Sequence, residues 1–222
     1  MDINQIDINQ LMYGIAVGAI PVLFAVTLHE VAHGWVASLR GDPTAEMLGR
    51  LSLNPLKHID PVGTILVPGL MLLFSPYLFG WAKPVPVSFN RLNHPKSDMI
   101  FVALAGPLAN LLMAILWVMV LKFTLVSGLK GGVAGDWLYA MAEIGIFINI
   151  ILGAFNLLPI PPLDGGRVLR GLVPESIGRY LDRIEPFGLI ILVVLLVSGF
   201  LRVLVGPIFS FMKSLIFFVT GL

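Results

Sequence analysis

The residues best suited to chemistry form the motif His29-Glu30-x-x-His33, inside an apolar run over residues 11–39. Residues four apart share one face of a helix, so the two imidazoles can bind one metal ion. Glu30 lies about 100° around the helix from His29, where its carboxylate can reach a water on that ion without being a ligand. Two nitrogen ligands, an open position for water and a carboxylate that accepts a proton are the parts of a metal hydrolase.

The apolar setting of this motif favours a functional site. On insertion scales an ionisable side chain inside a bilayer costs about 2.5 to 3.5 kcal/mol. Three such side chains in one apolar run therefore need a partner that stabilises them there. A bound metal ion is such a partner. The alternative is a structural cluster whose polar groups satisfy one another inside a helix bundle.

The composition indicates an all-α polytopic membrane protein. Of the 222 residues, 57% are hydrophobic and 12% are charged, whereas soluble domains average about 25% charged residues. The net charge of +1 provides no basic surface for nucleic acid. Cysteine is absent, which excludes disulfides, thiolate catalysis and cysteine ligands. Any bound metal must therefore be held by histidine, aspartate or glutamate.

Apolar segments divide the chain into candidate membrane spans. Five are long enough to cross or nearly cross a bilayer, namely residues 11–39, 99–126, 137–158, 186–205 and 207–222. The last two are predicted to form a helical hairpin, 186–222, that turns at Gly206-Pro207. A sixth run, 62–80, is interrupted by prolines and glycine. We expect five to six transmembrane helices in one membrane-embedded domain, residues 1–222, with its core at 11–172.

Two short segments predict interfacial strands or extended backbone. Leu51 and Leu53 alternate with polar residues, and residues 85–89 alternate apolar side chains with proline and serine. Proline cannot donate to a strand ladder, so the second segment would have to lie at a sheet edge. Ordinary proline-rich loops are the alternative at both places.

A third metal ligand is predicted where the third long apolar segment ends. Residues 155–167 contain three prolines and two glycines, which unwind a helix and expose backbone groups. Such backbone is tolerated at membrane depth only where it is buried in protein or lines a cavity. Asp164 is therefore the natural third ligand beside His29 and His33. The alternative is that Asp164 caps a helix beginning near Gly165.

Other polar residues in apolar or proline-flanked sequence are expected to be structural. Asn110 lies within the second span and is expected to hydrogen-bond to a neighbouring helix. His58 and His94 lie in proline-flanked loops, where a hydrogen-bonded or interfacial histidine is favoured over a ligand.

Three motifs taken together resemble the site-2 protease family of intramembrane zinc metalloproteases. They are His29-Glu30-x-x-His33, Gly106-Pro107-x-x-Asn110 and Asn156-x-x-Pro159-x-x-Leu163-Asp164-Gly165-Gly166. The resemblance covers residues 11–172 and is closest to short prokaryotic members without a PDZ or nucleotide-binding domain.

The resemblance implies a function and a set of roles. One zinc ion would be bound by His29, His33 and Asp164, with Glu30 as general base. Asn156 matches a family asparagine that contacts the substrate or the oxyanion. The implied activity is hydrolysis of peptide bonds within or near transmembrane segments, either in regulated intramembrane proteolysis or in clearance of signal-peptide remnants. The implied partners are a transmembrane protein or peptide substrate and the lipid bilayer, and no feature indicates an oligomeric state.

A shared ion also constrains the topology. The histidines and Asp164 lie near the carboxyl ends of their segments, so segments 11–39 and 137–158 must run parallel. Parallel spans need an odd number of crossings between them, and segment 99–126 supplies one. Residues 62–80 are therefore predicted to be a re-entrant element, with a sixth full span as the alternative.

Charge supports the same arrangement. One side of the membrane then receives most of the basic residues, namely Arg40, Arg50, Lys57, Lys83, Arg91, Lys96, Arg167, Arg170, Arg179 and Arg183. The other side receives mainly Lys130 and Arg202. By the positive-inside rule, we predict a multi-pass protein of the cell membrane with its amino terminus outside and its active site toward the cytoplasm.

Two further functions stay open from the residues alone. A metal-ion transporter would use the same four polar residues as a transient site, but it would need further ionisable groups on other spans. Lys122 is the sole charged residue between residues 99 and 126, which makes such a pathway hard to build. An inactive binding relative would be expected to have lost Glu30 or Asp164, and both are present.

Overall fold

The computed structural model describes residues 8–74 and 80–221, and within them it contains helices and no strand. The all-α prediction is confirmed, whereas the strands predicted at residues 51–53 and 85–89 are wrong. The backbone of the second segment bonds to side chains instead of to a neighbouring strand. The Val85 amide donates to Glu30, and the Arg50 guanidinium donates to the carbonyl groups of Lys83 and Pro84.

Four of the described helices are long and apolar enough to cross a membrane, which is typical of a multi-pass membrane protein. They are α1 (Ile8–Leu39), α4 (Pro95–Val126), α5 (Val133–Asn156) and α9 (Phe200–Thr220).

The carboxyl-terminal helices turn at a different place from the one predicted. Helix α8 (Gly188–Val197) ends before Gly199, whose φ of +74° is a left-handed conformation that glycine adopts readily. Pro207 lies inside α9, so the predicted corner at Gly206-Pro207 is wrong. A helix of ten residues rises about 15 Å, which is about half of the hydrocarbon core of a bilayer.

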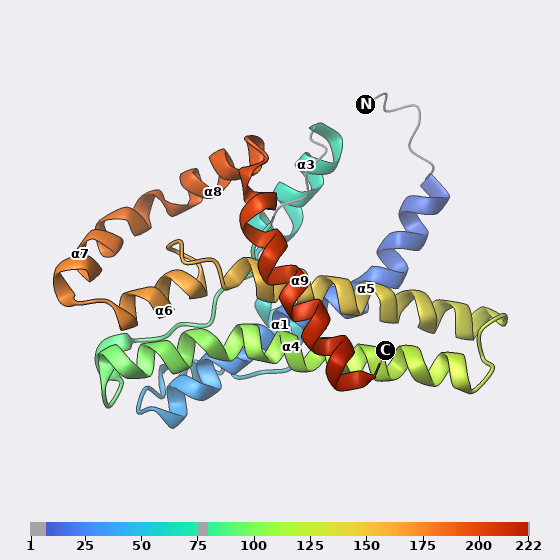
Figure 1. Cartoon of the computed structure of the whole chain (residues 1–222), viewed down its shortest axis with the longest axis horizontal. Coiled ribbons are helices and arrows are strands. Elements are labelled where there is room, and N and C mark those ends of the chain that lie inside the picture. Colours follow the sequence, from blue (N-terminus) through green and yellow to red (C-terminus); the bar gives the residue numbers. More distant parts are fainter. Residues whose placement is uncertain (1–7, 75–79, 222) are drawn as a thin grey trace.

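Helices α1, α4 and α5 form the bundle that positions the site. Figure 1 shows α4 and α5 side by side with α9 packed across them. The ring centres of Tyr13 and Trp137, near the amino ends of α1 and α5, lie 5.4 Å apart. At the other end, His29 of α1 lies 3.2 Å from Asp164, just beyond α5. Helices α1 and α5 therefore run in the same direction, as predicted, and α4 runs opposite to both.

Small residues allow these helices to pack closely. A Cβ atom on Gly145 of α5 would lie 2.4 Å from the indole ring of Trp117 on α4. A Cβ atom on Gly153 would lie 2.7 Å from Met212 of α9. The main apolar core lies among α4, α5, α8 and α9 and comprises Ala114, Val118, Ile150, Ala154, Leu158, Leu163, Leu192, Val205, Met212 and Ile216.

The apolar run at 62–80 leaves the bundle and returns to the place where it began. A π-helix over Pro61–Leu66 continues into α3 (Val67–Phe74), and residues 75–79 lie outside the described part. The Trp81 amide donates to the Gly63 carbonyl at 3.0 Å, and the Thr64 hydroxyl donates to the Trp81 carbonyl at 2.9 Å. The two ends of the excursion are therefore in direct contact.

Short helices and loops gather at the carboxyl end of α1. The helices are α2 (Thr44–Met47), two single turns over Pro55–His58 and Phe89–Arg91, α6 (Asp164–Leu172), α7 (Glu175–Ile184) and a turn over Glu185–Phe187. Two buried carboxylates hold this end together. Asp42 accepts hydrogen bonds from the amides of Thr44 and Ser88, and Asp98 binds Arg40 at 3.2 Å.

Candidate metal centre

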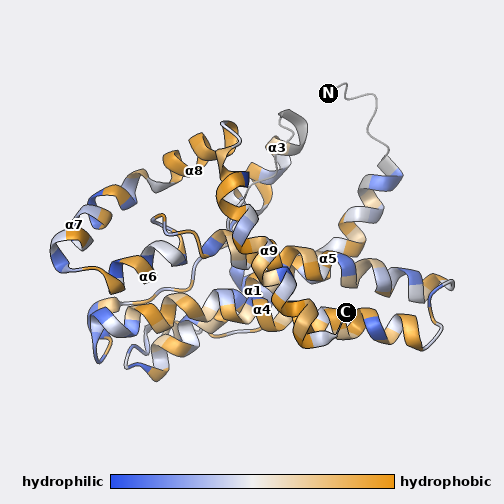
Figure 2. Cartoon of the chain, in the orientation of Figure 1, coloured by the Kyte–Doolittle hydropathy of each residue, from blue (hydrophilic) through white to orange (hydrophobic). Residues whose placement is uncertain are grey.

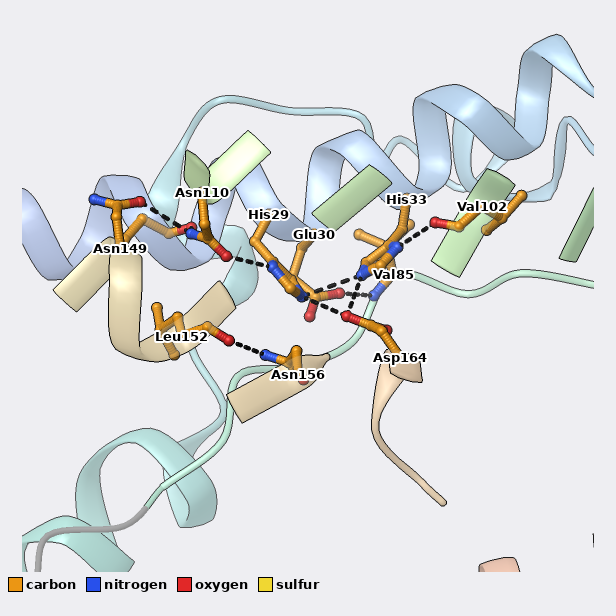
Figure 3. Close-up of polar contacts among 11 residues, drawn as sticks. His29, Glu30, His33, Val85, Val102, Asn110, Asn149, Leu152, Asn156 and Asp164 are labelled. Carbon is orange, nitrogen blue, oxygen red and sulfur yellow. Dashed lines mark hydrogen bonds and ion pairs between the residues drawn. The ribbon is translucent and has the colours of Figure 1, made fainter. Parts of the chain in front are cut away.

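Three potential ligands from α1 and α6 converge on one point. The Nε2 atoms of His29 and His33 lie 3.1 Å apart. The Oδ2 atom of Asp164 lies 3.2 Å from the first and 3.3 Å from the second. His29 and Asp164 are each 8% exposed, so the point is largely enclosed. The structure thus brings together the three residues that the sequence singled out (Figure 3).

Hydrogen bonds on the far side of each ring decide which nitrogen faces this point. His29 Nδ1 lies 2.7 Å from Asn110 Oδ1, and His33 Nδ1 lies 2.7 Å from the Val102 carbonyl oxygen. Both oxygens are acceptors, so each Nδ1 carries the proton and donates it. Each neutral ring therefore presents the lone pair of Nε2 to the centre, which is the form that binds a metal.

A chain of side-chain amides fixes the orientation of Asn110. Its Nδ2 donates to the Ala25 carbonyl at 3.2 Å and to Asn149 Oδ1 at 3.0 Å. Asn149 in turn donates to the Gly145 carbonyl at 2.8 Å. Both asparagines are completely buried. Because backbone carbonyls are obligatory acceptors, the Oδ1 of Asn110 must point to His29. The sequence analysis did not single out Asn149. Its position inside an apolar span was the feature by which it could have been found.

The three donors fit a tetrahedral metal ion. Asp164 Oδ2 is buried and has no hydrogen-bond partner among the described residues, and its nearest polar neighbours are the two Nε2 atoms. Two lone pairs and a carboxylate oxygen at such short separations repel one another unless a cation lies between them. Zinc–ligand bonds of 2.0–2.2 Å in a tetrahedron give ligand separations of about 3.3–3.6 Å. The observed separations of 3.1, 3.2 and 3.3 Å lie close to the lower end of that range.

Helix α4 approaches the centre at a glycine. A Cβ atom on Gly106 would lie 2.4 Å from His33 Nε2 and 2.7 Å from His29 Nε2. Any larger residue would therefore occupy the space that the donors enclose. Gly106 belongs to the motif that contains Asn110, so one segment of α4 provides both the space and the hydrogen bond to His29.

Glycines after Asp164 set its position. Helix α6 begins at Asp164 with Leu163 as its amino-terminal cap, and no side chain caps it. The alternative that Asp164 caps the helix is therefore wrong. A Cβ atom on Gly165 would lie 2.3 Å from the Leu157 carbonyl oxygen, and one on Gly166 would lie 2.5 Å from the Pro161 nitrogen. Both glycines let α6 pack against the proline-rich loop and direct the carboxylate toward the histidines.

Glu30 lies beside the donor group without belonging to it (Figure 3). Its Oε2 accepts a hydrogen bond of 2.7 Å from the Val85 amide. A Cβ atom on Gly34, one turn further along α1, would lie 2.7 Å from the side chains of both Leu51 and Val85. Gly34 thus allows the loop to approach α1 closely enough for the Val85 amide to orient the glutamate.

The remaining polar candidates are not members of the donor group. Asn156 donates through Nδ2 to the Leu152 carbonyl one turn earlier in α5, at 3.1 Å. His58 is buried and bonds to the Ser52 carbonyl at 2.8 Å. His94 is exposed and lies 3.9 Å from Asp98. Neither of these histidines belongs to the group of potential ligands found in residues 8–74 and 80–221.

A helical membrane bundle that encloses two histidines and an aspartate defines the class of membrane-embedded proteins with a hydrolase-type metal centre. The model of peptidase family M50 matches residues 125–200, which include Asp164. The chain is 39% identical over 180 residues to "Putative zinc metalloprotease YwhC" of Bacillus subtilis, covering 81% of this chain and 79% of that protein. The chain therefore belongs to peptidase family M50, the site-2 protease family.

Other relatives carry similar names. The chain is 31% identical over 182 residues to "Putative zinc metalloprotease Rip2" of Mycolicibacterium smegmatis, covering 79% of this chain and 64% of that protein. It is 40% identical over 108 residues to "Putative zinc metalloprotease MJ0611" of Methanocaldococcus jannaschii, covering 48% and 44%. No solved structure matches the chain.

Proposed function

We propose that this protein is an intramembrane zinc metalloendopeptidase that hydrolyses peptide bonds within or near the transmembrane segments of other membrane proteins. His29, His33 and Asp164 hold one zinc ion, and Glu30 is the general base. The observation that carries the proposal is the convergence of two Nε2 lone pairs and a partnerless carboxylate oxygen, inside an apolar bundle. Membership of peptidase family M50 supports the reaction class.

Zinc, when bound, supplies a Lewis acid that polarises the scissile carbonyl and lowers the pKa of water to about 7. The chain supplies the proton transfers. Glu30 Oε2 is held by the Val85 amide, which leaves the other carboxylate oxygen to take a proton from the attacking water. The same carboxyl group then donates that proton to the leaving amine. Asn156, the last residue of α5, is proposed to contact the substrate or the oxyanion, as the matching family motif implies.

The substrate is proposed to bind in an extended conformation along residues 85–89, with residues 48–53 as the second possible edge. A helical substrate hides its peptide bonds, so it must unwind before hydrolysis, and an edge of free backbone groups can replace the lost hydrogen bonds. The Val85 amide is already bonded to Glu30, and the Ser88 amide to Asp42. Val87 is therefore the residue of this segment whose amide is best placed to pair with substrate.

Proline at position 87 tests this edge. Val87→Pro removes the amide donor and is expected to slow cleavage of a model transmembrane substrate or to shift the cleaved bond, with the zinc content unchanged. The measurement is mass spectrometry of the products from proteoliposomes. Val87→Ala, which keeps the amide, is the control. Unchanged rate and cleavage position in Val87→Pro would contradict the proposed edge.

The proposed topology places the site on the cytoplasmic side, the amino terminus outside, and residues 62–80 in a re-entrant element. The contact between Gly63 and Trp81 supports re-entry, because both ends of the excursion lie together. The described helix over residues 61–74 would rise about 21 Å, which is short of the ~30 Å core of a bilayer. The distribution of basic residues supports the orientation.

The experiment that tests the function separates metal binding from chemistry. Glu30→Gln keeps the shape of the side chain and an acceptor oxygen for the Val85 amide, but it cannot accept the proton of water. We expect the purified variant to retain one zinc per chain by elemental analysis and to lose at least 100-fold in cleavage rate. His33→Ala is the matched variant, which should lose both zinc and cleavage. Cleavage by Glu30→Gln at the normal rate would overturn the proposal.

A further inference from the structure

Helix α7 (Glu175–Ile184) has an apolar face that no other described part of the chain covers. Ile177, Tyr180 and Ile184 are three, four and seven residues apart, so they share one side of the helix. Their exposed fractions are 50%, 64% and 41%. Exposed apolar groups of this size on one face of a short helix indicate a surface that contacts something else.

The opposite face of α7 is attached to the protein through Arg170 of α6. The guanidinium binds Glu175 at 2.8 Å and Asp182 at 2.9 Å. It lies over Gly178, where a Cβ atom would come within 2.4 Å of it. Glu175, Gly178 and Asp182 share a face by the same spacing. The apolar face of α7 therefore points away from α6 and away from the rest of the protein.

These ion pairs also change the charge that α7 presents. By sequence the helix has two acidic and two basic residues, and Arg170 of α6 forms ion pairs with both acids. Arg179 and Arg183 are exposed and form no salt bridge within residues 8–74 and 80–221. The guanidinium of Arg183 lies 5.8 Å from the ring centre of Tyr180, at the border of the apolar face. The outward side of α7 is thus apolar and flanked by unpaired positive charge.

The apolar face continues into a segment that requires lipid. Every residue of α8 is apolar except its first glycine, and Ile190, Val194 and Val197 are more than half exposed. Figure 2 shows α8 hydrophobic along its length and α7 with mixed polarity. Exposed Phe187 lies between them. One continuous apolar surface therefore runs from the embedded helix α8 to α7.

We propose that α7 lies in the headgroup region of the membrane and binds anionic phospholipid. Its apolar face enters the boundary of the acyl chains, while Arg179 and Arg183 contact phosphate groups. An amphipathic helix with aromatic and aliphatic residues on one face and cations beside it has the pattern of an interfacial anchor. The bilayer is the occupant because α8 is apolar throughout and the two side chains of α7 that form no salt bridge among the described residues, Arg179 and Arg183, are positive; exposed Glu185 lies just beyond the helix. This proposal does not depend on zinc or on peptide hydrolysis.

Site-specific labelling tests the proposal, because the chain has no cysteine and a single introduced one is a unique site. An environment-sensitive fluorophore is attached to Ile177→Cys on the apolar face, or to Lys57→Cys at an exposed position outside α7 as the control. Each full-length protein is reconstituted in vesicles of phosphatidylcholine with or without phosphatidylglycerol. Quenching is measured with brominated lipids and with aqueous iodide.

We expect the label at position 177 to be quenched several-fold more by brominated lipid than the label at 57, at a depth of about 5–10 Å into the boundary between headgroups and acyl chains. Iodide should show the reverse order. Equal quenching of both labels by iodide would overturn the proposal. Protection of the label at 177 from both quenchers, which a second protein chain on this face would produce, would also overturn it.

The charge part has its own readout. Addition of phosphatidylglycerol should increase lipid quenching at position 177, and Arg179→Gln with Arg183→Gln should abolish that increase. Arg202→Gln, on another helix, is the charge-matched control and should keep it. If phosphatidylglycerol has no effect in the otherwise unaltered labelled protein, the proposed binding of anionic lipid is wrong.

Discussion

Hydrogen bonds at the two Nδ1 atoms decide which ring nitrogen of His29 and of His33 carries the proton. The Asn110 side-chain oxygen and the Val102 carbonyl each bind an Nδ1 atom, and Asn149 holds Asn110 in the required orientation. Sequence analysis expected Asn110 to hydrogen-bond to a neighbouring helix, which is confirmed. It did not reveal that the partner is His29, nor that Asn149 on α5 takes part. Those pairs are 81 and 39 residues apart in the chain, and nothing local in the sequence specifies them.

Removal of Asn149 tests this chain of amides. Asn149→Leu removes one of the two acceptors that fix the Asn110 amide, so we expect zinc affinity to fall about 10- to 100-fold, the range for residues that orient metal ligands. Competition with a zinc chelator measures the affinity, and the absorption spectrum of the cobalt-substituted protein reports the ligand geometry. Thr124→Val is the control, because Thr124 is equally buried but bonds only within α4.

A double variant distinguishes an orienting role from general destabilisation. If Asn149 acts through Asn110, the affinity losses of Asn149→Leu and Asn110→Leu should not add in the double variant. Additive losses, or a normal cobalt spectrum in Asn149→Leu, would show that the amide chain does not orient His29.

At the scale of the elements, glycines allow the close approaches on which the site depends. Gly106 brings α4 to the imidazoles, Gly34 brings the Val85 loop to α1, and Gly165 lets α6 pack under the end of α5. The sequence analysis identified Gly106 as part of a motif with Asn110, and Gly165 as one of two glycines that unwind the helix near Asp164. The structure shows what each one contacts, which depends on how the helices are paired.

Alanine at position 106 tests the approach of α4. The added methyl group of Gly106→Ala would occupy the space beside both Nε2 atoms. We therefore expect the zinc content of the purified variant to fall to less than half of the normal value while its helical circular dichroism spectrum is retained. Gly206→Ala in α9 is the control, since no atom lies within 4 Å of a Cβ atom there. A full complement of zinc in Gly106→Ala would contradict this account.

At the scale of the whole molecule, α1 and α5 run in the same direction and α4 packs against both in the opposite direction, and this arrangement brings His29 and Asp164 to one depth. The parity argument from the sequence predicted the parallel pair, and the contacts at both ends of α1 and α5 confirm it. The proposed re-entrant element follows from the same number of membrane crossings between α1 and α5. A further crossing at 62–80 would place the loops before and after it on opposite sides of the membrane.

Thiol labelling tests that topology. Lys57→Cys precedes the excursion, Lys96→Cys follows it, and Lys130→Cys lies between α4 and α5. We expect a membrane-impermeant maleimide to label positions 57 and 96 in inverted vesicles and position 130 in right-side-out vesicles. The cysteine-free parent protein is the control. Labelling of positions 57 and 96 from opposite sides would show that residues 62–80 cross the membrane.

Local patterns in the sequence determined the helical class, the apolar segments that form α1, α4 and α5, and the shared face of His29 and His33, because helix periodicity and bilayer thickness act on short stretches. The proline and glycine pattern also pointed to Asp164. The convergence of Asp164 on the two histidines, the turn at Gly199 in place of Gly206-Pro207, and the bond from Val85 to Glu30 were decided by tertiary structure. Each depends on which distant surfaces pack together, and a one-dimensional pattern does not contain that information.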